Sequence, residues 1–228
     1  MSKNLLEHFI SALSPLECHI CNKEEFMLCF ECAQTIVPEV ESRCYLCNKL
    51  TSQNKICSSC RPRSRLRRVW WLGPYKHVLK ELVFEMKYSR KRAYAREFGK
   101  LLDSALPYFP EDTIVMPVPT ASKRIRERGY DQAVLIAESF SKQRGLPLSL
   151  AIMRTSQAEQ IGKRRVERMK QMESSLSMKN SNSVKGKNIL LIDDVLTTGA
   201  TLESAARLLR ENGAKHVDGA VVARHLLG

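Results

Sequence analysis

Apolar residues along this chain follow two spacings, one typical of helices and one typical of short buried strands. They recur every three or four residues in four segments, which predict helices at 76–88, 94–106, 132–143 and 202–212. Pro107, Gly145 and Gly213 follow three of these segments and would end the helices. Short apolar runs predict strands at 113–118, 148–153, 189–192 and 217–223. Strands that alternate with helices favour an α/β fold with a parallel sheet.

The thirteen residues from Ile189 to Thr201, ILLIDDVLTTGAT, carry the most specific chemistry of the chain. Four apolar residues predict a buried strand that ends in two carboxylates, and a turn of small residues leads into the helix expected from Leu202. Ligands of open α/β sheets bind beyond the carboxyl ends of the strands, and backbone N–H groups at a helix N-terminus hold phosphate. Each feature alone is common at ordinary strand ends and turns, but their contiguous order favours a phosphate site.

We therefore predict a site for phosphoribosyl pyrophosphate (PRPP) and Mg²⁺, in which the carboxylates meet the ribose hydroxyls and the metal. The predicted residues are Asp193, Asp194, Thr197, Thr198, Gly199, Ala200 and Thr201. The run resembles the signature of type I phosphoribosyltransferases, four apolar residues followed by acid-acid-x-x-Thr-Thr-Gly-x-Thr, without a departure.

All eight cysteines lie in the first 60 residues, as four Cys-x-x-Cys pairs: Cys18/Cys21, Cys29/Cys32, Cys44/Cys47 and Cys57/Cys60. Glu7 and His8 interrupt the apolar core that a secretory signal needs, and no run approaches transmembrane length. We therefore expect a cytoplasmic protein with reduced thiols that bind metal. Eight thiolates suit two zinc ions, each with four ligands. One zinc with four spare thiols, or redox chemistry, are the alternatives.

The pairing of the cysteines stays open at this point. Binding of one zinc by the first two pairs and of another by the last two is the simplest arrangement, and an alternating cross-brace is the other. The first 60 residues are poor in apolar side chains, so bound metal must provide the stability that burial of apolar surface does not. We predict a double zinc ribbon module at 1–62 and a phosphoribosyltransferase-like domain at 63–228.

Charge is distributed unevenly between these two parts. Residues 1–60 carry five basic and seven acidic side chains, a formal −2, which leaves +15 for the remainder of a chain whose net charge is +13. Such a basic domain attracts polyanions. Five arginines lie within residues 61–68, the arginine segment, and Trp70 and Trp71 follow it. This order fits either a strip that tracks single-stranded DNA with stacking rings, or a charged linker with buried tryptophans.

Together, these blocks resemble the ComF family of competence-associated proteins, which combine a double zinc ribbon with a phosphoribosyltransferase-like domain. The resemblance covers nearly the whole chain. Its middle blocks here are MPVPTASKRIRERGYDQA and RTSQAEQIGKRRVERMKQ. Tyr130 and Asp131 stand where the family has Phe and Asn, and Gln171 where it has Asn.

The basic residues of these blocks are candidates for binding pyrophosphate, because arginine offers bidentate donors to phosphate. We assign this role to Arg124, Arg128, Arg165 and Arg168, the last two on a polar segment, 155–187, expected to be a loop or partly ordered hood over the ligand. Neither a general base nor an acceptor can be identified from the sequence.

The resemblance implies a protein that handles single-stranded DNA during natural transformation, with a competence helicase and other uptake proteins as partners. A catalytically active phosphoribosyltransferase with an unknown acceptor is the alternative. Gly186-Lys187 is followed by Asn188, so the chain has no Walker A motif and is not itself a motor.

Overall fold

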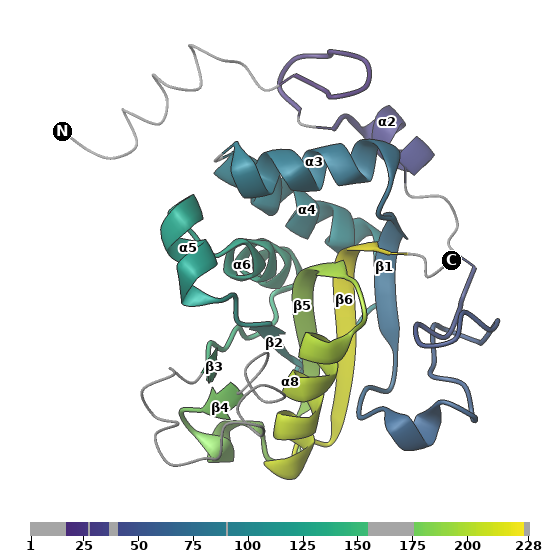
Figure 1. Ribbon diagram of the computed structural model, residues 1–228, viewed down its shortest axis with the longest axis vertical. Coiled ribbons are helices and arrows are strands. Elements are labelled where there is room, and N and C mark those ends of the chain that lie inside the picture. The colour runs from purple at the N-terminus through teal and green to yellow at the C-terminus, as the bar shows by residue number, and fades with distance from the viewer. Residues whose placement is uncertain (1–16, 27, 37–40, 90, 155–175, 226–228) are drawn as a thin grey trace, which may run out of the picture.

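A four-stranded parallel sheet forms the centre of the computed structural model, which describes residues 17–26, 28–36, 41–89, 91–154 and 176–225 (Figure 1). The strand order is β1-β6-β5-β2, and every neighbouring pair is parallel. The strands are β1 (Val69–Pro74), β2 (Ile114–Pro117), β5 (Asn188–Leu196) and β6 (His216–Arg224). The predicted α/β class with a parallel sheet is confirmed.

Helices cover both faces of this sheet (Figure 1). One face packs against α3 (His77–Tyr88), α4 (Arg92–Ala105) and α6 (Gln132–Arg144). The other packs against α8 (Ala200–Glu211). Successive side chains of a strand point to opposite faces, so Trp70 lies in the core under α3 and Trp71 in the core under α8.

Smaller elements complete the described fold. They are α2 (Phe30–Ile36), α5 (Ser122–Arg128), the 3₁₀ turns Arg61–Arg63 and Ser181–Val184, and an antiparallel pair of β3 (Ile152–Arg154) with β4 (Leu176–Met178). The strand expected at 148–153 is therefore displaced, although Leu148 forms an isolated parallel bridge with Val115. Residues 155–175 of the expected hood lie outside the described residues.

Three expectations need correction. The strand expected at 189–192 continues to Leu196, so both carboxylates lie within it, because its pairing with β6 extends to Leu196 and Arg224. The helix expected from Leu202 begins at Ala200. The predicted strands also left out residues 69–74, which form edge strand β1 through pairing with β6.

The two cysteine groups join different cores. Cys18, Cys29 and Cys32 lie in the core with α3, whereas Cys44 and Cys60 lie in the core with α8. Each group thus packs against the later part of the chain, on opposite faces of one sheet. The division at 62/63 stays a prediction. Within the described residues, no helix is both long enough and apolar enough to span a membrane.

Candidate phosphate and metal sites

The predicted phosphate loop lies between the end of β5 and the start of α8. Gly199 is the N-cap of α8 with φ 79° and ψ 1°, a left-handed conformation that glycine adopts readily. Thr198 Oγ1 accepts a hydrogen bond from the Ala200 N–H at 3.3 Å. Thr197, Thr198 and Ala200 are exposed, and Thr201 is half-buried. Backbone N–H groups at the start of a helix lack partners within it and attract anions, so this turn can hold a phosphate.

The two carboxylates before the loop have different environments. Asp194 is 6% exposed, and its oxygens pair with Lys87 Nζ at 3.0 Å and with Gln132 Nε2 at 2.8 Å. Asp193 is half-buried, and its Oδ1 accepts the N–H of Asp194 at 2.8 Å. Adjacent residues of a strand face opposite sides, so only Asp193 lies on the α8 side of β5.

Electrostatics also separate the pair. Removal from solvent, and then the charge of Asp194, raise the pKa of Asp193 to about 8. Asp194, by contrast, accepts hydrogen bonds from Lys87 Nζ and Gln132 Nε2. A cation such as Mg²⁺ near Asp193 would favour loss of its proton. A site that binds Mg²⁺ and a sugar requires this ionised form of the carboxylate.

Arg154, which was not among the predicted site residues, interacts electrostatically with both Arg124 and Asp193. Its Nε donates to the carbonyl oxygen of Pro119 at 2.9 Å, directly after β2. Burial and the nearby guanidinium of Arg124 lower the pKa of Arg154, and the charge of Asp193 opposes them. The structure thus brings Arg124, Arg154 and Asp193 into one electrostatic neighbourhood. Only the position of Arg154 at the start of the block RTSQAEQIGKRRVERMKQ could have indicated this.

Arg128 is placed differently from Arg124. It ends α5, is 9% exposed, and its guanidinium lies 5.7 Å from the ring centre of Tyr88. Among the described residues, its buried Nη1 has no hydrogen-bond partner, and neither has Gln132 Oε1. Buried polar atoms without partners are rare and costly, so both suit a bound water or ligand. Arg165 and Arg168 lie outside the described residues.

The eight cysteines form two groups of four, taken in sequence order. The sulfurs of Cys18, Cys21, Cys29 and Cys32 lie within 4.8 Å of one another, as do those of Cys44, Cys47, Cys57 and Cys60. Zn–S bonds of about 2.3 Å in a tetrahedron place sulfurs about 3.8 Å apart. The Cys21–Cys29 and Cys47–Cys57 distances, 3.6 and 3.5 Å, fit that geometry. Each group could therefore bind zinc, and the sequential arrangement is the one observed.

Comparisons with known proteins agree with this architecture. The family model described as phosphoribosyl transferase domain matches residues 125–226. The chain is 31% identical to competence protein ComFC of Bacillus subtilis (strain 168) over 202 residues, which cover 84% of this chain and 81% of that protein. It is 23% identical to the DNA utilization protein YhgH of Escherichia coli (strain K12), over 83% of this chain and 93% of that one. The chain belongs to the ComF family.

Among solved structures, the allosteric regulatory enzyme of purine biosynthesis is similar, with a TM-score of 0.43 and 22% identity over 57% of this chain and 25% of that chain.

Two departures from the ComF pattern have local partners here. Tyr130 is buried, and its hydroxyl donates to the carbonyl oxygen of Met86. Asp131 caps α6: its Oδ1 accepts the N–H of Ala133 at 3.0 Å and the hydroxyl of Thr120 at 2.9 Å. Both substitutions therefore keep the segment between α5 and α6 in place. Gln171 lies outside the described residues.

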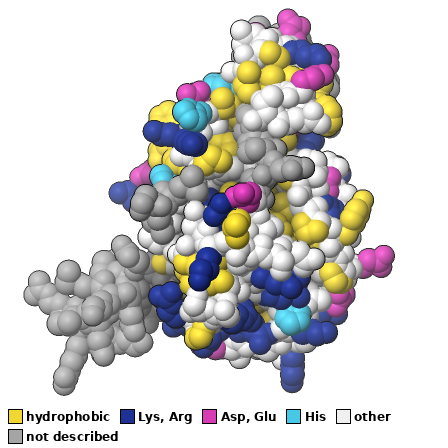
Figure 2. Space-filling view, turned by 90° about the vertical axis from the view of Figure 1, so that its right-hand side faces the viewer, with side chains coloured by type: hydrophobic (Ala, Val, Ile, Leu, Met, Phe, Trp, Pro, Cys, Tyr) yellow, Lys and Arg dark blue, Asp and Glu magenta, His cyan; other side chains and the backbone are white. Residues whose placement is uncertain are grey.

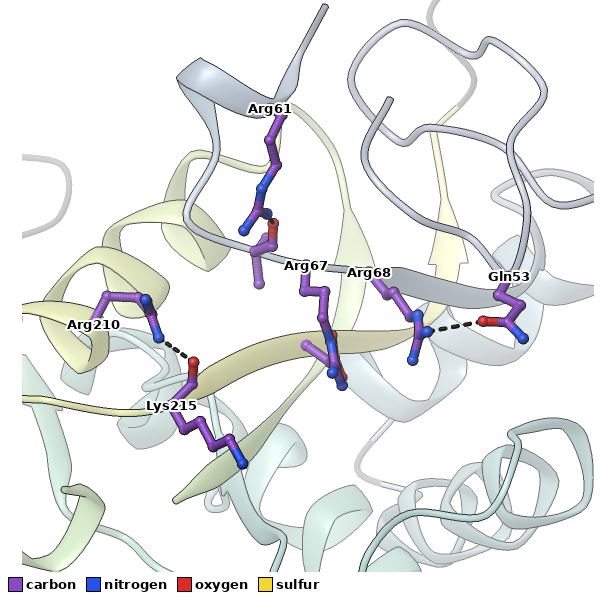
Figure 3. A network of polar contacts seen from close by, with 8 residues as sticks. Gln53, Arg61, Arg67, Arg68, Arg210 and Lys215 are labelled. Carbon is purple, nitrogen blue, oxygen red and sulfur yellow. Dashed lines mark hydrogen bonds and ion pairs between the residues drawn. The ribbon is translucent and has the colours of Figure 1, made fainter. Parts of the chain in front are cut away.

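The stacking part of the arginine-segment hypothesis is wrong. Trp70 and Trp71 are each 7% exposed, inside the two cores of the sheet. The guanidinium of Arg67 pairs with the buried carboxylate of Asp218, with Nε 3.0 Å from Oδ1. Arg68 donates to Gln53 Oε1 at 2.8 Å (Figure 3). The exposed arginines of the segment are Arg61, Arg63 and Arg65.

Proposed function

We propose that this ComF-family protein binds PRPP, or a related phosphoribosyl ligand, with Mg²⁺ at the carboxyl end of β5, and that it handles single-stranded DNA during DNA uptake. The observation that supports the first part most directly is the β5–turn–α8 unit, with Gly199 in the left-handed conformation at the N-cap of α8. A phosphate there would meet backbone N–H groups and the positive end of the helix dipole.

In this proposal each neighbouring residue has a task. The turn from Thr197 to Thr201 holds the 5′-phosphate, and Asp193 meets the ribose hydroxyls and the Mg²⁺ ion. Arg124, Arg128 and Arg154 neutralise the pyrophosphate. Asp194, already paired with Lys87, fixes the end of β5 instead of contacting the ligand. Mg²⁺ would supply charge neutralisation at the pyrophosphate and lower the pKa of Asp193.

We further propose that each cysteine group binds one zinc ion as a closed structural site. The clustering of four sulfurs in each group supports this. The Ser59 hydroxyl lies 3.2 Å from the Cys57 sulfur, where it can stabilise the thiolate that a metal requires.

Two surfaces support the proposal for single-stranded DNA. Basic side chains gather over the lower part of the face in Figure 2, and Arg61, Arg65 and Arg210 line one hollow of about 360 Å³. Phe84 and Tyr88 of α3 are 52% and 65% exposed, with ring centres 4.8 Å apart. Exposed rings beside cations suit stacked bases and phosphates. A competence helicase and other uptake proteins are the proposed partners, from the likeness to competence proteins.

Binding of PRPP with Mg²⁺, measured by calorimetry and as a rise in melting temperature, tests the first part. Asp193→Asn keeps the oxygen that accepts the Asp194 N–H but removes the charge, so we expect PRPP affinity to fall at least about tenfold. Asp112→Asn, at an exposed aspartate before β2, is the matched control and should bind like the parent. Unchanged binding by Asp193→Asn would place the pocket elsewhere.

Turnover distinguishes the enzyme alternative. Release of pyrophosphate from PRPP in the presence of candidate bases would show a phosphoribosyltransferase, whereas binding without release would indicate a ligand sensor or structural site.

A further inference from the structure

Tyr45, between two cysteines of the second group, lies directly against the phosphate loop. It is 3% exposed, and a Cβ built on Gly199 would lie 2.7 Å from Tyr45 Cε2. Only a glycine leaves room for this ring, and only a glycine readily adopts φ 79° at that position. The loop that we propose to hold phosphate therefore packs on a side chain from the cysteine-rich region.

The hydroxyl of Tyr45 also reaches the first turn of α8. It donates to Glu203 Oε1, and the hydroxyl of Ser64 donates to the same oxygen. The backbone N–H of Arg65 donates to Oε2 at 3.0 Å. A carboxylate in the first turn would repel a phosphate bound at the helix N-terminus. These three donors, from Tyr45, Ser64 and Arg65, hold the Glu203 carboxylate in place and offset part of its charge.

The backbone around Tyr45 is held to the sheet at the same place. Arg224, at the end of β6 and 2% exposed, donates through Nη2 to the carbonyl oxygen of Tyr45 at 2.8 Å and through Nη1 to Asn48 Oδ1 at 3.1 Å. Its guanidinium lies 4.6 Å from the ring centre of Trp71. Arg224 is in register with Leu196, the last residue of β5 before the loop. Tyr45 thus connects the cysteine group, the end of β6 and the phosphate loop.

We infer that Tyr45 is a positioning residue for the phosphate loop, and that metal held by Cys44, Cys47, Cys57 and Cys60 raises the affinity of the loop for a phosphoribosyl ligand. This inference rests on the proposed function. Metal held by Cys44 and Cys47 would fix the backbone on both sides of Tyr45, so that the loop is ordered before the ligand binds. Because such coupling is reciprocal, the ligand in turn strengthens metal binding at this group.

The first cysteine group provides an internal control. His19 occupies the equivalent position there, one residue after the first cysteine, and its Nε2 lies 3.0 Å from Glu81 Oε2 of α3. That contact is on the opposite face of the sheet, away from Gly199. Metal at the first group should therefore leave the phosphate loop unaffected.

The full-length, zinc-loaded protein and its Tyr45→Ala, Tyr45→Phe and His19→Ala variants test the inference with ribose 5-phosphate as the probe. Two measurements are needed: calorimetric affinity, and backbone amide hydrogen exchange of residues 197–203 without ligand. We expect Tyr45→Ala to bind about tenfold more weakly and to exchange at least about tenfold faster in the loop. Tyr45→Phe, which keeps the ring, should show a smaller change, and His19→Ala none.

Amide hydrogen exchange measured without ligand distinguishes failure of this inference from failure of the proposed function. If the parent protein binds no ribose 5-phosphate but Tyr45→Ala still exchanges faster in the loop, the proposed function fails and the positioning role stands. If a folded Tyr45→Ala variant matches the parent in both measurements, the inference is overturned.

Zinc release to a chelator gives a second test if Tyr45→Ala does not fold. Ribose 5-phosphate should slow the release of one of the two zinc ions from the parent protein by about tenfold. In Tyr45→Phe the same ligand should slow this release by a smaller factor. Equal release with and without ribose 5-phosphate, in a protein that binds it, overturns the coupling.

Discussion

At the scale of single residues, Asp193 and Asp194 show how neighbouring carboxylates acquire different properties. Asp194 faces Lys87 and Gln132 and is nearly inaccessible, whereas Asp193 faces the α8 side and has a pKa raised to about 8. Alternation along β5 separates them, since neighbouring side chains of a strand cannot share one environment. One residue can thus stabilise the strand end while the other remains suited to a ligand.

The raised pKa of Asp193 predicts a pH dependence of stability. The unfolded carboxyl titrates near 3.8 and the folded one near 8, so between these values the folded state keeps a proton that the unfolded state loses. The free energy of unfolding should therefore fall as pH rises from about 4 to 8. Asp193→Asn removes this titration, so its stability relative to the parent should increase between pH 4 and pH 8, by on the order of 5 kcal/mol in total.

Urea unfolding of zinc-loaded parent and variant at pH 5, 6, 7 and 8 measures this difference. A difference that stays constant across the series would show that Asp193 titrates normally.

Lys87 gives a second prediction at this scale. Its side chain is 16% exposed and that of Asp194 8%, so Lys87→Met would leave a buried carboxylate without its cation. We expect a loss of about 3 kcal/mol in the free energy of unfolding. Lys100→Met, which breaks the exposed pair of Lys100 with Glu97, should cost less than about 0.5 kcal/mol. Equal losses in the two variants would contradict a buried ion pair at the end of β5.

At the scale of elements, the cysteine groups act as parts of the two cores. Cys18 is buried with α3 and Trp70, whereas Cys44 is buried with α8 and Trp71. A chain of about 60 residues buries so little apolar surface that its stability is marginal without metal or help from other elements. Here both sources are combined, since each group of sulfurs is also packed against a helix-covered face of the sheet.

The two tryptophans can report on these cores separately. In a Trp70→Phe background the emission comes from Trp71, and Cys44→Ser should shift it to longer wavelength because loss of a thiolate releases metal from the second group. In a Trp71→Phe background the same substitution should leave the Trp70 emission nearly unchanged. Cys18→Ser should show the opposite pattern. If either cysteine substitution shifts both tryptophans equally, the two cores unfold as one unit.

At the scale of the whole molecule, the positive charge and the exposed aromatic pair make distinct contributions to binding DNA. Salt dependence reports phosphate binding, whereas stacking contributes affinity with little salt dependence. Arg67 pairs with a buried carboxylate and Arg68 is half-buried, so the arginines most accessible to phosphate are the exposed Arg61, Arg63 and Arg65. Arg61 also donates to the carbonyl oxygen of Leu66, and Arg63 to the sulfur of Cys60 at 3.5 Å.

Replacing these three arginines by alanine should reduce the slope of log affinity against log salt for single-stranded DNA by about one for each arginine that binds a phosphate. Phe84→Ala with Tyr88→Ala should weaken binding by about 1–3 kcal/mol per stacked base without changing the slope. Tyr108→Ala is the matched control, because Tyr108 is also exposed and lies beside an arginine, Arg144. Fluorescence anisotropy across a salt series measures both quantities, and an affinity independent of salt would contradict phosphate binding.

Much of the architecture could be derived from local sequence. The run from Ile189 to Thr201 carries its strand, turn and helix start within thirteen residues, and each Cys-x-x-Cys pair is a complete knuckle in itself. Helical spacing located α3, α4, α6 and α8 to within about two residues, because amphipathic periodicity is a local property.

Only the tertiary structure decided which side chains meet across long separations. The burial of Trp70 and Trp71 depends on β1 pairing with β6, some 150 residues later, and the sequence left that burial as one of two alternatives. The partners of Asp194, the approach of Arg154 to Asp193 and the packing of Tyr45 on Gly199 likewise join distant elements. Spacing along a chain encodes the shape of one element, whereas contacts between elements depend on how their faces pack, and that information is distributed over the whole sequence.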